Sequence, residues 1–128
     1  MATKQLGPIE QIQVVKYAGA SGDFNPIHTV PEAAAKAKLP STIAHGMMSM
    51  GFLGTLVTDW LGVDAELKKF GVRFTSMTLP GDMLTLTGRI AKKYEHEGQP
   101  RVDLELSIEK QDGATTVKGW AVVEWRKP

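Results

Sequence analysis

Apolar and polar residues follow two different periods along this chain, and the change of period divides it into halves. Residues 9–60 repeat their apolar positions at the spacing of helices, whereas residues 65–126 alternate at the spacing of strands. No internal repeat, low-complexity tract or linker interrupts either half. The pattern predicts an α+β fold, with helices first and an antiparallel sheet after them.

Two short helices are predicted in the first half, on either side of residues 23–28. The first covers residues 9–20, where apolar positions recur at helical spacing, and it ends at Ser21-Gly22. The second covers residues 32–38, which are rich in strong helix formers. Thr29, followed by Glu32 three residues later, is typical of a capping box, so we expect Thr29 to cap this second helix.

A third helix, from Gly46 to about Trp60, is apolar on almost every side. Its hydrophobic residues are Met47, Met48, Met50, Phe52, Leu53, Leu56, Val57, Trp60 and Leu61. A helix of this kind is buried on nearly all sides. It is shorter than the roughly 20 residues that cross a bilayer. We therefore expect protein to surround it, with Gly62 ending it.

The second half reads as strands separated by turns. The residues expected on the buried face are Val72, Phe74, Leu84, Leu86, Ile90, Val102, Leu104, Leu106, Ile108, Val117, Ala121, Val123 and Trp125. Turn signals lie at residues 79–82, 97–100 and 111–113. This pattern predicts an antiparallel meander with one buried and one wetter face.

One buried helix followed by a long meander predicts the hot-dog fold, an antiparallel sheet wrapped around a long central helix. A single helix cannot cover such a sheet completely. We therefore expect a dimer with a continuous sheet across the interface, formed with a second copy or with a related hot-dog subunit.

Composition narrows the classes of function. The 128 residues are 42% hydrophobic, which suits one compact domain over residues 1–128. The net charge of +1, with no basic cluster, argues against nucleic acid as a partner. The chain has no cysteine, which excludes thiolate metal sites and a cysteine nucleophile. It also shows neither a signal peptide nor an apolar run long enough to span a membrane, so a cytoplasmic location without membrane contact is expected.

The candidate chemistry begins at Asp23 and His28, which flank an Asn25-Pro26 break. Pro26 disfavours the helical conformation at the residue before it, so the segment bends and both side chains can converge. A carboxylate and an imidazole that share a water can move a proton on and off it near neutral pH. The alternative is purely structural: Asn25-Pro26 punctuates a helix, Asp23 caps it and His28 is a hydrogen-bonded core residue.

A second short motif favours the catalytic interpretation over the structural one. Residues 17–28, followed by residues 43–47, resemble the hydratase 2 motif of the MaoC-like (R)-specific enoyl-thioester hydratases. Residues 71–74 and 79–82 resemble the strand and turn that follow the central helix in that family. The resemblance runs from about residue 9 to the end of the chain.

Two positions depart from the family pattern. Only residues 1–8 precede the first predicted helix, where members often carry an additional strand, so the edge of the sheet is in doubt. Some members also carry a supporting serine eight residues after the glycine of the His-Gly-Met unit. Gly54 occupies that position here, so no serine role is carried over.

The resemblance implies the addition of water to the trans-2 double bond of an enoyl thioester, or the reverse dehydration. It implies that Asp23 and His28 bind the water, that Asn25 holds the bend, and that the Gly46 amide contacts the thioester oxygen. Which of Asp23 and His28 delivers the proton to C2 is left open. His45 is expected to be structural, and the methionines of the third helix to fill the core or line an acyl tunnel.

Neither a metal nor an organic cofactor is implied, because the family uses none. The spacing of Asp23, His28 and His45 matches no common ligand pattern. The substrate is expected to be a thioester of CoA or of an acyl-carrier protein. Two alternatives stay open: the catalytic subunit of a heteromeric hot-dog dehydratase of fatty-acid elongation, and an acyl-thioester hydrolase.

Overall fold

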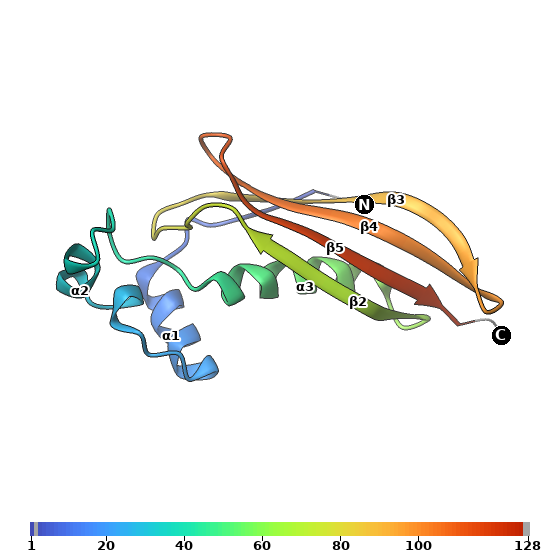
Figure 1. The fold of residues 1–128 in the computed structure, drawn as a ribbon, viewed down its shortest axis with the longest axis horizontal. Helices are drawn as coiled ribbons and strands as arrows, with labels where there is room; N and C mark the ends of the chain where they lie inside the picture. The colour runs from blue at the N-terminus through green and yellow to red at the C-terminus, as the bar shows by residue number, and fades with distance from the viewer. Residues whose placement is uncertain (2, 127–128) are drawn as a thin grey trace.

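The computed structural model describes Met1 and residues 3–126, so residues 2, 127 and 128 of the predicted domain lie outside the described residues. A curved five-stranded antiparallel sheet packs against one long helix, and the shorter helices lie together at one end (Figure 1). In chain order the elements are β1 (Lys4–Leu6), α1 (Gln11–Ser21), the 3-10 helix η1 (Pro26–His28), α2 (Pro31–Lys36), α3 (Gly46–Leu61), β2 (Ala65–Phe74), β3 (Leu84–His96), β4 (Gln99–Lys110) and β5 (Thr115–Trp125).

The order of strands in the sheet is β1-β3-β4-β5-β2. Strands β3, β4 and β5 form the predicted meander, but β2 pairs with β5 at the far edge rather than with β3. The expectation of one meander through all the strands is therefore wrong at β2. The connection over residues 75–83 reaches about 30 Å when extended, which easily covers the roughly 14 Å from β2 to β3.

The short strand β1 pairs with β3 and completes the other edge of the sheet. Residues before the first helix therefore supply an edge strand, although only three residues of it are paired. This answers the doubt about the edge that the short N-terminal segment raised.

The core lies between α3 and the concave face of the sheet. The predicted alternation is confirmed along β3, β4 and β5, whose buried apolar residues are Leu84, Leu86, Val102, Leu104, Leu106, Ile108, Val117, Ala121 and Val123. From α3 come Met48, Leu53, Leu56 and Val57. Strand β2 differs because it is an edge, and its last residue, Phe74, is 49% exposed.

The predicted helices form close to their expected limits, but two local expectations are wrong. Helix α2 begins with Pro31 at its first position after Val30, and no side chain caps it, so Thr29 is not its cap. Proline suits this position because its fixed φ is helical and its missing N–H needs no partner. In α1 the buried residues are Val14 and Ala18, whereas Ile12 and Val15 of the expected apolar pattern are exposed.

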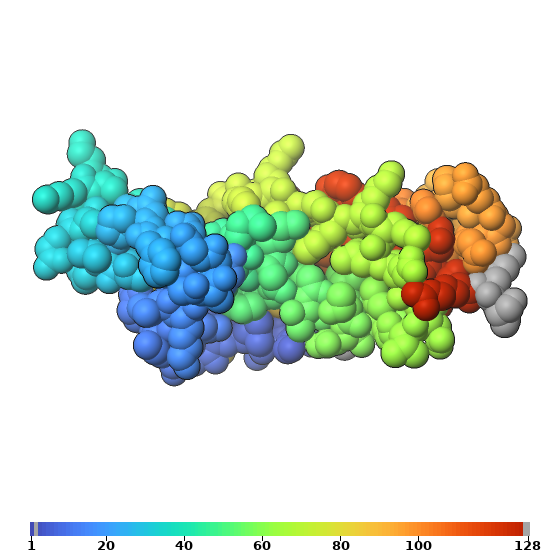
Figure 2. Space-filling model, turned by 90° about the horizontal axis from the view of Figure 1, so that it is seen from below, coloured from blue at the N-terminus to red at the C-terminus, as the bar shows by residue number. Residues whose placement is uncertain are grey.

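Helix α3 is not covered on all sides within one chain. Met47, Gly51, Thr55 and Thr58 form an exposed stripe on it, because they recur at intervals of three or four residues. Figure 2 shows the surface of α3 open between α1 and β2. Within the described residues, no helix is both long and apolar enough to cross a membrane.

Candidate active site

The candidate site lies at the end of the molecule where η1, the start of α3 and the end of β2 meet. Asn25 has an extended ψ of 122°, as the residue before a proline should, and its side-chain oxygen accepts a hydrogen bond from the Ile27 amide at 3.2 Å. The amide of His28 donates to the Asn25 carbonyl at 3.1 Å. The Asn25-Pro26 break therefore builds a single 3-10 turn that brings His28 back toward Asp23.

His28 is buried and held in one tautomer. Its Nδ1 atom lies 2.7 Å from the carbonyl oxygen of Ile43. A carbonyl only accepts hydrogen bonds, so Nδ1 carries the proton and Nε2 is left with a lone pair. The Nε2 atom faces the Oδ2 atom of Asp23 at 3.9 Å, with side-chain exposures of 10% for His28 and 53% for Asp23.

The gap between these two atoms is suited to a water molecule. A separation of 3.9 Å is too long for a direct hydrogen bond, but a water placed between them can bond to both. Asp23 uses its other oxygen, Oδ1, to accept a hydrogen bond from the Asn25 amide at 3.2 Å. The pair thus presents one free acceptor on the carboxylate and one on the imidazole, facing each other.

Gly46 lies beside this pair at the first position of α3. The first amides of a helix have no partner inside it and lie at the positive end of its dipole, so they bind developing negative charge well. A Cβ atom on Gly46 would lie 3.1 Å from ring carbons of Phe74. The absence of a side chain therefore allows the Phe74 ring to rest against the start of the helix.

Two cavities meet at this point. The first, the polar cavity, has a volume of about 420 Å³ and is lined by the polar residues Tyr17, Ser21, Asp23 and His45. The second has a volume of about 240 Å³, and its lining includes Ile43, Ala44, Ser49, Thr78 and Val117. His28, Gly46 and Phe74 line both. Met47 lines the polar cavity and is 58% exposed, so it is not core filler.

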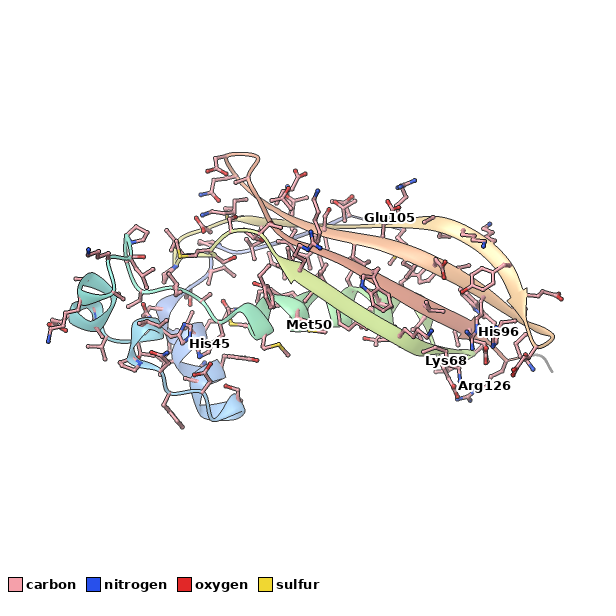
Figure 3. All side chains as sticks on the ribbon, in the orientation of Figure 1. His45, Met50, Lys68, His96, Glu105 and Arg126 are labelled. Carbon is pink, nitrogen blue, oxygen red and sulfur yellow. The ribbon has the colours of Figure 1, made fainter. Side chains whose placement is uncertain are left out.

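His45 is the residue that sequence reasoning left out of the site. It is 2% exposed, and its ring stacks on that of His28 with centroids 3.7 Å apart and planes 22° apart. On its other side Tyr17 makes an edge contact at 4.7 Å. Figure 3 shows His45 beside α1, just before α3 begins. The one signal in the sequence is its position immediately before Gly46.

Asp23, His28 and His45 offer ligand atoms within 4.8 Å of one another, the one such group found among the described residues. Their orientation does not suit an ion. Imidazole lone pairs lie in the ring plane, and nearly parallel rings 3.7 Å apart cannot both direct them at one ion at about 2.1 Å. Moreover, one nitrogen of each ring is bonded to a backbone carbonyl. The cluster is better described as a hydrogen-bonded acid–base site.

The charged residues whose pKa values are clearly shifted lie outside the candidate site. Hydrogen bonds from Lys68 and Arg126 lower the pKa of Glu66 to about 2. Figure 3 shows Lys68 and Arg126 at the opposite end of the sheet from His45. These groups lie outside the candidate site.

A sheet curved around one helix defines a hot-dog protein, and the aspartate–histidine pair at the start of that helix is its candidate acid–base site. The chain belongs to the MaoC-like domain family, whose model matches residues 2–112. This confirms the family resemblance and the fold predicted from the sequence.

Relatives and solved structures agree with this placement. The beta subunit of fatty acid synthase from Aspergillus oryzae is 37% identical over 116 residues, covering 86% of this chain and 5% of that protein. The (R)-hydratase from A. caviae involved in PHA biosynthesis is 28% identical, with a TM-score of 0.81, and 98% of this chain and 95% of that one are covered. The ChsH1-ChsH2 complex from Mycobacterium tuberculosis supports the fold, with 19% identity, a TM-score of 0.86, and coverage of 98% and 94%.

Proposed function

We propose that this chain is a hydro-lyase of fatty-acid metabolism that hydrates trans-2-enoyl thioesters to (R)-3-hydroxyacyl thioesters and catalyses the reverse dehydration. One observation carries the proposal. The free acceptor atoms of Asp23 and His28 face each other at 3.9 Å, in a cavity that also includes Gly46 at the start of α3.

The reaction needs three things from the protein, and the site offers each. Asp23 and His28 hold a water, and His28 Nε2 takes its proton as the oxygen bonds to C3. The electrons of the double bond move onto the thioester carbonyl, and the Gly46 amide stabilises the resulting enolate oxygen. A proton then returns from the Asp23–His28 pair to C2. Because one cluster handles both the oxygen and the proton, the two add to the same face of the double bond.

Each of these contributions has a typical size. A positioned acid–base group contributes about 10²–10⁴-fold to the rate, and an oxyanion donor about 10²–10³-fold. Together these groups supply base, proton source and charge stabilisation, so the mechanism assigns no step to a metal or organic cofactor.

The relatives support the substrate class. An (R)-hydratase and a fatty acid synthase subunit are among them, which suggests a thioester of CoA or of an acyl-carrier protein. The chain spans only 5% of that synthase subunit, so its residues 1–128 are proposed as one catalytic domain rather than as the equivalent of the whole relative.

The exposed edge of strand β2 also favours pairing of this chain with a second subunit. The long edge strand β2 has no partner on its outer side within the described chain, and two structural neighbours are described as complexes, ChsH1-ChsH2 and HadBC. The chain therefore pairs either with its own copy or, as the catalytic subunit, with a related hot-dog chain.

The decisive experiment is hydration of crotonyl-CoA and of a longer enoyl-CoA in deuterium oxide, after chelator treatment, with chiral analysis of the product. We expect the (R)-product with oxygen and deuterium on the same face. Formation of the (S)-product or anti addition would contradict the mechanism, and activity restored by zinc or magnesium would contradict its independence of metals. Release of free thiol without loss of the double bond would instead identify a thioester hydrolase.

A further inference from the structure

The loop that carries Asp23 is fastened almost entirely to itself. The Asp23 amide donates to the Ser21 hydroxyl at 3.2 Å, and the Asn25 amide donates back to the Asp23 carboxylate. Phe24 does not anchor the loop, because it is 69% exposed. Among the described residues, one hydrogen bond of residues 22–25 reaches beyond residues 18–28, and it joins the Asp23 carbonyl to His45.

In this hydrogen bond His45 is the donor. Its Nε2 atom lies 3.0 Å from the Asp23 carbonyl oxygen, which only accepts, so Nε2 carries the proton. The remaining ring nitrogen, Nδ1, is buried and has no hydrogen-bond partner among the described residues. If the ring merely filled space, an apolar side chain would fill it without leaving a buried polar atom unpaired. Donation to the Asp23 carbonyl gives a physical reason for an imidazole at this position.

His45 is itself firmly held. It is the N-cap residue of α3, directly before Gly46, and its ring lies between Tyr17 of α1 and His28 of η1. The preceding residue, Ala44, donates its amide to the Thr78 carbonyl at 2.8 Å. His45 therefore joins an exposed loop to the buried start of α3, one residue away from the proposed oxyanion donor.

We propose that His45 is a positioning residue that sets the distance between the Asp23 carboxylate and the Gly46 amide. It acts through the Asp23 backbone and takes no part in the proton transfers assigned to Asp23 and His28. Rates depend steeply on such distances, since a misplacement of about 1 Å costs on the order of 10²-fold. The inference rests on the proposed function, because the distance matters only if water and thioester bind at these two groups.

Two substitutions of similar size separate the hydrogen bond from the filling of space. His45→Gln keeps an amide N–H near the position of Nε2, whereas His45→Met has no donor and packs adaptably. We expect His45→Met to lower kcat for crotonyl-CoA hydration on the order of 10²-fold with little change in KM. His45→Gln should restore most of that loss. A residue that served only stability would affect both variants equally, in step with their thermal unfolding.

Amide hydrogen exchange supplies a readout that does not depend on activity. We expect residues 22–25 to exchange at least about tenfold faster in His45→Met than in His45→Gln, with β3 and β4 unchanged in both. Equal exchange and equal kcat in the two folded variants would overturn the proposal. If the wild-type chain fails to hydrate enoyl-CoA while the exchange difference persists, then the proposed function is wrong and the tether to Asp23 stands.

Discussion

Asp23 and His28 are held in different ways, which decides how each tolerates substitution. Asp23 is half exposed on a loop, so replacing it removes few packing contacts. His28 is buried, and its Nδ1–H satisfies the Ile43 carbonyl, so a substitution there must keep that donor or leave a buried acceptor unpaired. Tests of the chemistry therefore need variants that respect these contacts.

Asp23→Asn and His28→Asn are each expected to lower kcat by about 10²–10⁴-fold, because each removes an acid–base group. The side-chain amide of Asn at position 28 can still donate to Ile43, so both proteins should remain folded. Asp59→Asn, an exposed site on α3, is the control for loss of a surface charge and should keep full activity. Steady-state kinetics with crotonyl-CoA and thermal melts check this, and a folded variant with near-normal activity would refute the assignment.

Asn25 stabilises the turn rather than taking part in the chemistry. Asn25→Ala removes the acceptor of the Ile27 amide and should cost about 1 kcal/mol of unfolding free energy, as the loss of an N-cap does. A drop in kcat should accompany it, because His28 follows in the same turn. Asn25→Ser keeps a short acceptor and should recover most of both. Urea denaturation and kinetics measure the two effects, and an alanine variant as stable as the serine variant would argue against the role.

At the scale of elements, a buried carboxylate helps to tie the turn that leads into β3 to the end of β4. Asp82 is 6% exposed and accepts hydrogen bonds from the Leu79 amide at 2.8 Å and from the side chain of Gln111 at 2.9 Å. Lys110 forms an ion pair with it at 2.9 Å. Burial raises the pKa of Asp82, but these three partners outweigh it and leave the pKa below its ordinary value of 3.8.

Asp82→Asn should therefore destabilise the protein at neutral pH by about 1–3 kcal/mol, because Lys110 loses its charged partner and one acceptor is lost. A carboxyl with a lowered folded-state pKa contributes stability above its unfolded pKa and loses it as the pH falls through the folded value. The gap in stability between wild type and variant should thus be full above about pH 5 and shrink below about pH 4. Urea denaturation across this range checks it; a gap that is constant with pH would contradict the role of the charge.

At the scale of the whole molecule, one side of the chain exposes a strand edge and part of its long helix. Within the described residues, the outer side of the ten-residue strand β2 has no partner strand, and Figure 2 shows the surface of α3 open. Exposed strand edges are sites of association. The proposed dimer would extend the sheet at β2 and cover α3.

Gly51 lies in the exposed stripe of α3 and offers a test of this dimer. A Cβ atom there would meet nothing within 4 Å, so Gly51→Arg should not harm the single chain, and helix propensity favours it by up to about 1 kcal/mol. We expect sedimentation velocity to show dimers for wild type and for the control Gly51→Ala, and monomers for Gly51→Arg. A stable and active wild-type monomer at micromolar concentration would contradict the prediction.

Many features of this fold could be predicted from the sequence, because they depend on interactions between residues that are close together in the chain. The period of apolar residues predicted α1 and the strands β3, β4 and β5, because side-chain burial follows the geometry of each element. Strong helix formers predicted α2, and a continuous apolar segment predicted α3. Asn25-Pro26 predicted the bend at His28, because proline restricts itself and its neighbour. Gly22 and Gly62 marked helix ends through their positive φ. The paired motifs led to the family for the same reason: their residues are close in sequence.

Contacts between distant segments were decided only by the tertiary structure. The alternation in β2 is equally compatible with either edge of the sheet, and the structure shows β2 paired with β5 and β1 paired with β3. His45 reads as an ordinary residue before a helix, yet it joins Asp23, His28 and Tyr17, which lie 17 to 28 positions away. The exposed stripe on α3 could not be predicted either, because the apolar character of a helix does not show how many of its sides the same chain covers. Each of these features depends on which segments meet in space. The spacing of apolar residues within one segment does not identify the other segments that it contacts.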